Sequence, residues 1–411
     1  MRATICHLCL QCQPDKGLTV AAQAIFNAPR VDWCRPQQRK RTQTVRKIVL
    51  AVLAAVLTLT SAFAQTKRKV IIDQDARGPA TTDQQAMLML LQSPDVDVLG
   101  ITIVSGDQWR DEEIAHTLRM LELTGHKNAK VYPGAVFPLI NSKEEIARWE
   151  KLYGAVNYQG AWNQHKIHAP AGTAYTGAWN SGAYRSPYEV PDLPEGNPTL
   201  KAETEDAAHF IIRTLHQYPH EVTIYAGGPL TDLAQVVSLD PRAPELAQEL
   251  VIMGGSIAPQ MPMSWETANR REFNFWWDPE AVHMVLHAPW KKITVTTVDI
   301  SVKTKFTKEM IQQIGKSDTP SARYIRDWAD EEFLWDELAV AAWLDSSIIT
   351  RQESLFMDMD ISHTAGYGNT LVWMPGAQPG LGEQQVIVQQ DLNLEKFYKM
   401  LVELFTRPAP K

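Results

Sequence analysis

The chain has 411 residues, with 40 Lys and Arg against 47 Asp and Glu. Nine of the basic and two of the acidic residues lie in the first 64, so residues 65–411 carry a formal net charge of −14. A chain this acidic is not expected to bind nucleic acid or an anionic membrane. Its length permits two domains of about 150 residues each, but no Pro/Ser/Gly-rich linker divides residues 65–411, and we expect one domain with a large insertion.

The first 64 residues differ in character from the rest. A basic pair at positions 46 and 47 precedes an apolar run over residues 48–59, and small residues at 62 and 64 supply a cleavage site. The run is too short to span a membrane, so we expect a secretory signal peptide over residues 45–64 and an exported, periplasmic or secreted, mature protein. Signal peptides begin near the start codon, so we expect translation to start at Val45 and residues 1–44 to be a misassigned leader.

All four cysteines lie in that leader: Cys6, Cys9, Cys12 and Cys34. The first three invite a metal-site interpretation, but the second spaced pair that such sites need does not accompany them. We therefore interpret the leader with its cysteines as translated upstream DNA rather than as a metal site. Residues 65–411 contain no cysteine, so the mature protein is expected to be free of disulfides.

From residue 69 onward, apolar runs alternate with segments of helical periodicity. Strand followed by helix is typical of a parallel sheet with right-handed crossovers, and we expect an α/β fold. The expected strands are at residues 70–72, 98–104, 222–226, 250–253 and 293–298, and the expected helices at 83–92, 112–123, 204–217 and from 230.

A long insertion interrupts this rhythm at residues 136–200. It is rich in Trp, Tyr, Gly, Pro and Asn and shows no clear period. A segment of that length inside a compact domain is usually a lid or a binding surface. An oligomer contact or a functionless decoration is an equal alternative.

Three carboxylates gather where the first expected strand ends. Asp73 and Asp75 follow the apolar residues 70–72, and Asp83 begins the next helical pattern. In α/β proteins the carboxyl ends of the strands form the crevice that binds ligands. A hard divalent cation with oxygen ligands would cancel this negative charge and supply a Lewis acid. The simpler alternative is an acidic loop that caps a helix.

This acidic segment resembles the signature D-x-D-x-G-x-D-D of the inosine-uridine-preferring nucleoside hydrolases. Asp73 and Asp75 match its first two aspartates and Asp83 its last. Thr82 stands where the family has the third aspartate, and three extra residues separate Asp75 from Asp83. The expected metal loop is therefore longer than the family's.

Five further segments resemble the same family and occur in the family's order. Residues 98–107 look like its second strand, with Asp107 in place of a terminal Asn. Residues 335–340 resemble the "HDPLAVA" helix start, with Trp335 in place of His. The other three resemble "GPLTN" at residues 226–232, "VLMGG" at 251–255 and "EFN…DPEA" at 272–281. Each string alone is weak evidence, but six in order from residue 70 to about 345 make the resemblance specific.

The resemblance implies an open, mostly parallel, mixed central sheet with a Rossmann-like core, flanked by helices. It also implies a hydrolase that cleaves the N-glycosidic bond of ribonucleosides, or of a related N-riboside, to ribose and free base. It implies one Ca²⁺ whose bound water is the nucleophile, Asp75 as general base, and a homodimer or homotetramer. The implied metal ligands are Asp75, Asp83, Asp336 and the backbone carbonyl of Gly227. The implied substrate-binding residues are Asp107, Met253, Glu272, Asn274 and Trp335, with Asp73 and Thr82 in supporting roles.

The departures from the family concern the leaving group. In purine-active relatives the His before the last metal aspartate protonates the base, whereas the indole of Trp335 cannot act as an acid near neutral pH. Trp335 either stacks on a base or packs at the helix start. The acid is then His165, His168 or Tyr158 of the insertion, or the leaving group needs none. With Thr82 and Asp107 altered as well, the substrate need not be an ordinary inosine or uridine.

Two other functions stay open from the residues. A phosphatase of the haloacid dehalogenase type would use Asp73 as nucleophile and Asp75 as acid, but it needs a downstream Lys and a further acidic pair, and we find no such set after residue 220. An exported, calcium-dependent nucleoside- or sugar-binding protein with little activity is the second alternative, favoured by the altered acid position.

Overall fold

The computed structural model of the protein describes residues 67–156, 158–162, 167–168, 178–179, 186–258 and 270–409. Within these residues a nine-stranded sheet has the order β10-β9-β11-β8-β7-β6-β1-β2-β3. A separate pair, β4 (Ile167–His168) and β5 (Ala178–Trp179), lies in the insertion. The strands of the large sheet are β1 (Arg68–Gln74), β2 (Val96–Ile103), β3 (Val131–Pro133), β6 (Val222–Ala226), β7 (Glu249–Met253), β8 (Ile293–Thr296), β9 (Ile349–Met359), β10 (Thr370–Trp373) and β11 (Gln384–Leu392).

The helices that follow and cover these strands are mostly short. The described α-helices are α2 (Thr82–Gln92), α3 (Arg110–Thr124), α4 (Lys143–Tyr153), α5 (Ala207–Gln217), α6 (Thr231–Leu239), α7 (Ala243–Leu246), α9 (Phe273–Trp277), α10 (Pro279–Leu286), α11 (Val298–Ser301), α12 (Lys308–Ile314), α13 (Pro320–Trp328), α14 (Trp335–Leu344) and α15 (Leu394–Thr406). The single-turn 3₁₀ helices are η1 (Gly160–Trp162) and η3 (Ser346–Ile348). None of the described helices is long and apolar enough to cross a membrane.

The predicted fold class is confirmed: the sheet is mixed and mostly parallel. Neighbouring strands from β3 through β2, β1, β6, β7 and β8 to β11 pair in parallel, while β9 pairs antiparallel with both β11 and β10. The antiparallel edge escaped the sequence analysis. Its strands are half-exposed, and they lack the continuous apolar run that marks a strand buried on both faces.

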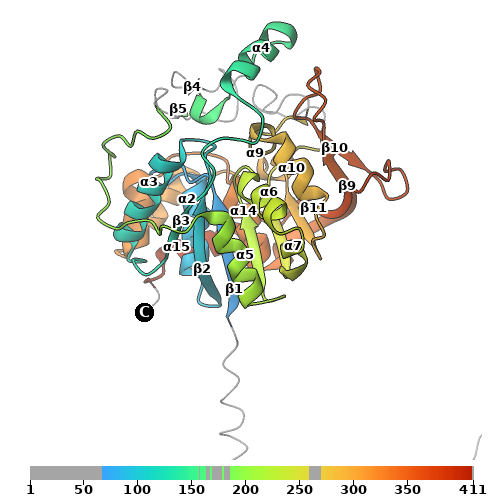
Figure 1. Ribbon diagram of the computed structural model, residues 1–411. Coiled ribbons are helices and arrows are strands. Elements are labelled where there is room, and N and C mark those ends of the chain that lie inside the picture. Colours follow the sequence, from blue (N-terminus) through green and yellow to red (C-terminus); the bar gives the residue numbers. More distant parts are fainter. Residues whose placement is uncertain are drawn as a thin grey trace, which may run out of the picture. The chain divides into compact units, whose positions relative to one another are not determined.

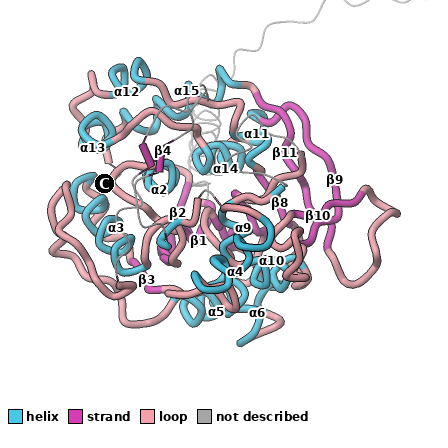
Figure 2. Tube along the Cα trace, turned by 90° about the horizontal axis from the view of Figure 1, so that it is seen from above, coloured by secondary structure: helices cyan, strands magenta, loops and turns pink. Residues whose placement is uncertain are grey.

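Helices cover both faces of the sheet, as Figures 1 and 2 show. One core lies between the sheet and α2, α3, α13, α14 and α15, and the other between the sheet and α5, α6 and α10. Successive residues of β1 alternate between them: Val70 and Ile72 enter the first core and Ile71 the second. Double burial explains why the first strand reads as an unbroken apolar run.

The predicted element boundaries hold to within a few residues, with two informative differences. The strand expected over residues 293–298 ends at Thr296, because Val298 already begins α11. The helix expected from residue 204 begins at Ala207, where the Asp206 side chain caps it by accepting a hydrogen bond from the His209 backbone N–H. The leader and the signal peptide, with their cysteines, lie outside the described residues.

The order of the strands places a crevice at the carboxyl end of β1. From β1 the chain proceeds to β2 and β3 on one side, then returns to β6 on the other side of β1. Such a reversal leaves a gap between the loops that follow the two neighbouring strands, which is where ligands bind in open α/β sheets. In Figure 1, α4 and α9 lie beyond this same edge of the sheet.

Candidate active site

A pocket lies at the carboxyl edge of the sheet, and nine of the eleven site residues expected from the sequence line it. The exceptions are Asp73 and Gly227. The lining residues are Asp75, Arg77, Thr82, Asp83, Asp107, Tyr158, Met253, Glu272, Phe273, Asn274, Val298, Glu332, Trp335 and Asp336.

Asp75 is held tightly at the end of β1. Its Oδ2 accepts a hydrogen bond of 3.0 Å from the backbone N–H of Asp107, which follows β2. A Cβ added at Gly106 would lie 2.1 Å from that same oxygen, and one at Gly228 would lie 2.8 Å from Oδ1. Only residues without a side chain allow the two neighbouring loops to approach this carboxylate so closely.

Asp83 and Asp336 come from the first turns of two helices that begin side by side, α2 and α14. Helix N-termini favour carboxylates because their free N–H groups carry partial positive charge. The side-chain amide of Gln74 lies between the two, with Nε2 donating to Asp83 Oδ1 at 3.2 Å and to Asp336 Oδ1 at 3.3 Å. The two carboxylates therefore present oxygens to a common point.

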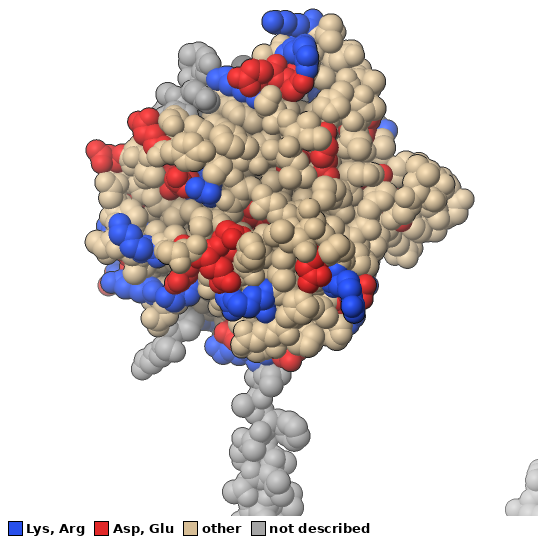
Figure 3. All heavy atoms as spheres, viewed as in Figure 1, with Lys and Arg blue, Asp and Glu red and all other residues tan. Residues whose placement is uncertain are grey.

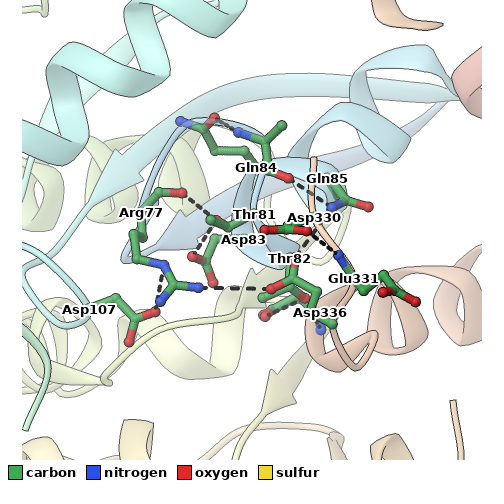
Figure 4. Close-up of polar contacts among 12 residues, drawn as sticks. Arg77, Thr81, Thr82, Asp83, Gln84, Gln85, Asp107, Asp330, Glu331 and Asp336 are labelled. Atoms are coloured by element: carbon green, nitrogen blue, oxygen red, sulfur yellow. Dashed lines mark hydrogen bonds and ion pairs between the residues drawn. The ribbon is translucent and has the colours of Figure 1, made fainter. Parts of the chain in front are cut away.

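Thr82 joins the two helix starts. Its hydroxyl accepts from the Asp336 N–H at 3.1 Å and lies 2.6 Å from Glu337 Oε2, to which it donates. Figure 4 shows Thr82 and Asp336 next to one another. An aspartate at position 82, as in the family signature, would face Asp336 and the buried Glu337 with a third negative charge. A hydroxyl suits this position because it can donate a hydrogen bond to its acidic neighbours.

Gly227 presents its backbone to the same region from the end of β6. A Cβ there would lie 1.8 Å from Gln74 Oε1 and 2.6 Å from Asp336 Oδ1, so glycine is required. Its carbonyl oxygen accepts a hydrogen bond of 2.6 Å from Asn274 Nδ2 and keeps a second lone pair. Tyr225, two residues earlier, donates to Asp336 Oδ1 at 2.9 Å.

The electrostatics of the pocket are those of crowded, buried acids. Burial raises the pKa of both Asp75 and Asp83 well above the usual range, and the charge of Asp107 adds to the effect. Burial likewise raises the pKa of Asp336 to about 7 and that of Glu332 to about 8. Carboxylates in such a place ionise readily only when a positive charge joins them.

The donor set fits a hard divalent cation. Asp75, Asp83 and Asp336 offer carboxylate oxygens, and Gly227 offers a carbonyl oxygen, from loops that the sheet brings together. Buried Gln74 Oε1 has no hydrogen-bond partner in the described part of the chain, so one more oxygen is free close by. Oxygen-only ligation from flexible carboxylates and carbonyls is what Ca²⁺ prefers, and Mg²⁺ accepts it less readily because it demands a regular octahedron.

Glu272 and Asn274 line the pocket, but most of their polar atoms already have partners. The Glu272 carboxylate caps α9, accepting from the backbone N–H groups of Asn274, Phe275 and Gly255 at 2.8–3.1 Å, and burial raises its pKa to about 7. Asn274 Nδ2 donates to Gly227 and, at 3.3 Å, to the carbonyl of Met253. These contacts position α9 against the strand ends.

Part of the insertion reaches the pocket. The Tyr158 hydroxyl donates a 2.8 Å hydrogen bond to Asp107 Oδ1, and burial raises the pKa of Tyr158 well above its usual value. Trp162 stacks on Trp277 at 3.9 Å between ring centroids, next to the site. Of the three candidate acids in the insertion, only the side chain of Tyr158 is described. His165 and the side chain of His168 lie outside the described residues.

Asp73 lies outside the pocket. It is completely buried and accepts a 2.6 Å hydrogen bond from the Thr102 hydroxyl. Burial raises its pKa, and the charge of Asp232 raises it further. A phosphatase nucleophile must reach its substrate, so this position argues against Asp73 in that role.

Two charged pocket residues escaped the sequence analysis, Arg77 and Glu332. Arg77 lies between Asp75 and Asp83, in the loop that is three residues longer than the family signature, and its guanidinium points to Asp107 (Figure 4), with Nε 3.5 Å from Oδ2. Its Nη2 lies 3.9 Å from Glu332 Oε2. The extra length of this loop was the available signal, since a longer loop between Asp75 and Asp83 can bring a further side chain to the pocket.

Trp335 is the first residue of α14 and is half-buried. Its ring lies 5.0 Å from the ring of Phe333, centroid to centroid, and it also lines the pocket. Trp335 therefore packs against Phe333 and also faces the pocket. Packing at the helix start and stacking on a base, the two expectations for this residue, do not exclude one another.

A second group with metal-ligand chemistry lies elsewhere. His283 of α10, His287 directly after this helix and Asp358 of β9 bring their ligand atoms within 4.8 Å of one another. Each imidazole already binds one oxygen of the Asp358 carboxylate, at 2.7 and 3.0 Å. None of the three lines the acidic pocket.

Comparison with known sequences agrees with the resemblance. The profile of the inosine-uridine preferring nucleoside hydrolase family matches residues 70–399. The inosine-uridine preferring nucleoside hydrolase of Crithidia fasciculata is 24% identical over 354 residues, 83% of this chain and 98% of that protein. Uridine nucleosidase 1 of Arabidopsis thaliana is 24% identical, over 80% of this chain and 90% of that protein.

Solved structures agree in fold. A plant nucleoside hydrolase superimposes with a TM-score of 0.62 at 23% identity, over 83% of this chain and 99% of its own. The purine-preferring ribonucleoside hydrolase from Gardnerella vaginalis gives a TM-score of 0.62 at 20% identity, over 82% and 99% of the two chains.

Proposed function

The chain belongs to the inosine-uridine preferring nucleoside hydrolase family, an enzyme family that hydrolyses the N-glycosidic bond of nucleosides, and we propose that its acidic pocket does so with calcium as the metal. The observation that carries this proposal is the meeting of three buried carboxylates, Asp75, Asp83 and Asp336, beside the carbonyl of Gly227. So many buried acids are costly unless a cation joins them.

Asp75, Asp83, Asp336 and Gly227 would hold the ion. When bound, Ca²⁺ would lower the pKa of a water molecule and take up the two vicinal hydroxyls of a ribose. This assignment uses three carboxylates that line the pocket and the carbonyl of Gly227 beside them, and it does not use Asp107 or Glu332.

Asp75 is the general base in this proposal. It is fixed by Asp107 N–H on one oxygen, so the other oxygen has a defined direction in which to accept a proton from the attacking water. The water oxygen attacks C1′ as the bond to the base nitrogen breaks, and the sugar passes through an oxocarbenium-like state. The surrounding carboxylates stabilise the positive charge that develops on the sugar.

The sugar would lie between the strand ends and α9. That side of the pocket is lined by Asn274, Glu272 and Met253. The hydrogen bond that Glu272 accepts from the Gly255 N–H fixes its side chain in place. Asp107 would accept from a sugar hydroxyl with Oδ2, the oxygen to which Tyr158 does not donate. Trp335 would stack on the base.

The same proposal includes three further features of the protein. It is exported, residues 136–200 form a lid over the pocket, and the chains assemble as a homo-oligomer. Relatives whose names specify uridine, pyrimidine or inosine as substrate define the panel that tests the base preference. Because the acid position is occupied by Trp335, a calcium-dependent nucleoside-binding protein with little turnover is the second candidate.

The test is release of reducing sugar from inosine, uridine, cytidine, adenosine and guanosine, with added Ca²⁺ or with a chelator. We expect at least one nucleoside to be cleaved, with activity lost on chelation and restored by Ca²⁺. Calcium-dependent binding of a nucleoside without cleavage would favour the second candidate. A protein that neither cleaves nor binds any of them contradicts both.

A further inference from the structure

Arg77 lines the pocket but has no role in the reaction described so far. It is the only Lys or Arg among the described residues that line the pocket, and it is 7% exposed. Its Nε and Nη1 are buried and make no hydrogen bond within the described part of the chain. A buried guanidinium with free donors costs stability unless a ligand uses them.

The loop around Arg77 is rigid. The Arg77 N–H donates to the Asp75 carbonyl at 2.7 Å, and the Thr81 hydroxyl donates to the Arg77 carbonyl. The next residue, Gly78, lies so close to His116 that a Cβ would come within 2.5 Å of its ring. The backbone on both sides of Arg77 is thus fixed, which directs the side chain into the pocket before any ligand binds.

The ion pairs of Arg77 are too long to occupy its donors. The distances are 3.5 Å to Asp107 Oδ2 and 3.9 Å to Glu332 Oε2, beyond normal charge-assisted hydrogen bonds. Asp107 and Glu332 are also carboxylates that the proposed metal site does not use. Their charge holds the guanidinium in place and leaves it able to donate to a third group.

The charge of the pocket decides what that third group is. Six carboxylates line the pocket against one guanidinium, so even with a divalent cation bound, a permanently anionic ligand would meet excess negative charge. A neutral nucleoside does not. During cleavage, positive charge develops on the sugar and negative charge on the departing base, and Arg77 is the only fixed cation among the described lining residues that can meet the latter.

We propose that Arg77 stabilises the leaving base by donating hydrogen bonds to it as the C1′–N bond breaks. The inference rests on the proposed function. The electron pair of that bond moves to the base nitrogen, the water oxygen bonds to C1′, and the water proton passes to Asp75. Arg77 keeps its proton, since a guanidinium does not deprotonate in proteins. The base then takes its proton from solvent.

This assignment fills the place that Trp335 cannot. The indole cannot act as an acid, and the Tyr158 hydroxyl already donates a hydrogen bond to Asp107. Fixed charge aimed at developing charge does not require proton transfer, and it acts strongly in a water-poor site. The three-residue expansion of the loop and the loss of the family's His are then two parts of one change, in which the leaving-group contact moves from α14 to the β1–α2 loop.

The experiment compares Arg77→Gln with the wild type on two ribosides of different leaving group. The first is the best nucleoside, whose base is a poor leaving group, and the second is 4-nitrophenyl β-D-ribofuranoside, whose phenolate leaves unaided. We expect kcat/KM to fall about 10²- to 10³-fold on the nucleoside, as for other single donors to a developing anion, and less than about 3-fold on the nitrophenyl riboside. Arg326→Gln, at an exposed arginine paired with Asp327, is the matched control and should change neither.

An equal fall of kcat/KM on both ribosides would overturn the inference, because Arg77 would then support the metal loop rather than the leaving base. Unchanged kcat/KM on both would also overturn it, because Arg77 would then have no part in the reaction. The inference would also be overturned if Arg77→Gln lowered kcat/KM only for nucleosides whose base carries a carboxylate. Arg77 would then bind an anionic substituent of the substrate rather than the leaving base. If Arg77→Gln does not fold, Arg77→Lys takes its place, because it keeps the charge without the planar guanidinium. The fall in kcat/KM must again be larger on the nucleoside than on the nitrophenyl riboside. Wild-type protein that cleaves neither riboside contradicts the proposed function itself, which separates the two failures.

Discussion

The two ends of the same parallel strands carry charge in opposite ways. At the amino ends, Lys69 pairs with Glu221 and Lys292 with Glu249, both at 2.7 Å and all partly exposed. Figure 3 shows basic and acidic side chains next to one another over the lower part of the face, where these strand ends lie. Each of these four charged side chains has a partner of opposite charge and is partly exposed to solvent.

At the carboxyl ends the charges are buried and nearly all of one sign. Asp75, Asp83 and Asp336 are at most 4% exposed, and Arg77 is the only cation among the described pocket-lining residues. An arrangement that destabilises the fold persists where function requires it. The amino ends therefore carry ordinary surface ion pairs, and the carboxyl ends hold a site whose cost the proposed cation would offset.

Replacing the proposed base should have the largest effect. Asp75→Asn removes a buried negative charge at constant shape, and we expect kcat/KM for the best nucleoside to fall by about 10³-fold or more. The measurement is release of reducing sugar, with circular dichroism to verify the fold. Asp318→Asn, at an exposed aspartate paired with Arg323, is the control and should retain full activity. Retained activity in Asp75→Asn would remove this residue from the role of base.

The buried acids should also reverse the usual pH dependence of stability in metal-free protein. The pKa of Glu332 is raised to about 8, and those of Asp336 and Glu272 to about 7, by burial. Between pH 6.5 and 8 the folded state holds protons that the unfolded state has already released, so the free energy of unfolding falls as pH rises. We expect a loss on the order of 2 kcal/mol, since one such group contributes about 1.4 kcal/mol per pH unit.

The check is thermal unfolding in a chelator at pH 6.5 and pH 8, repeated with saturating Ca²⁺. This window avoids His126, whose pKa is lowered to about 4 by burial and whose opposite effect ends near pH 6.5. Calcium should stabilise the protein more at pH 8, because it needs ionised ligands. A calcium effect that is the same at both pH values would argue against these carboxylates as the ligands.

Removing the aromatic face beside the pocket should have a moderate effect. Trp335 lines the pocket at the start of α14, and stacking of a base on an aromatic ring contributes about 1 to 3 kcal/mol. For Trp335→Ala we expect KM for the best nucleoside to rise about tenfold, with a smaller change for the nitrophenyl riboside. Trp335→Phe should recover most of the loss. Unchanged KM in Trp335→Ala would leave the residue with packing against Phe333 alone.

Substitutions at the amino ends of the strands should have the smallest effect on stability and activity. In Lys69→Ala the exposed pair with Glu221 is lost, and such pairs contribute little because water and salt screen them. We expect the melting temperature to fall by less than about 2 °C and kcat/KM to stay within a factor of two. A large loss of activity would show that the two ends of the sheet are coupled.

The parallel half of the sheet was predictable because its strands are buried on both faces. The apolar residues 70–72, 222–226 and 250–253 predict β1, β6 and β7 to within a few residues. The strands β9, β10 and β11 lie at an edge and mix exposed and buried positions, so their local pattern is weaker. Similarly, Asp75 and Asp83 stand out after an apolar run, whereas Glu332 is one acid in an acidic segment.

Local composition settles which residues end the buried strands, because an apolar run that stops at a carboxylate must place that carboxylate at the edge of the sheet. It does not settle which of those edges meet. Asp336 reaches Gln74 across 262 positions in the chain, and Arg77 turns toward Asp107 only because the loop around it is tied to β1 and to His116. Such contacts depend on the order of the strands and on exclusion of water. Both are properties of the packed whole and leave no trace in the spacing of residues along the chain.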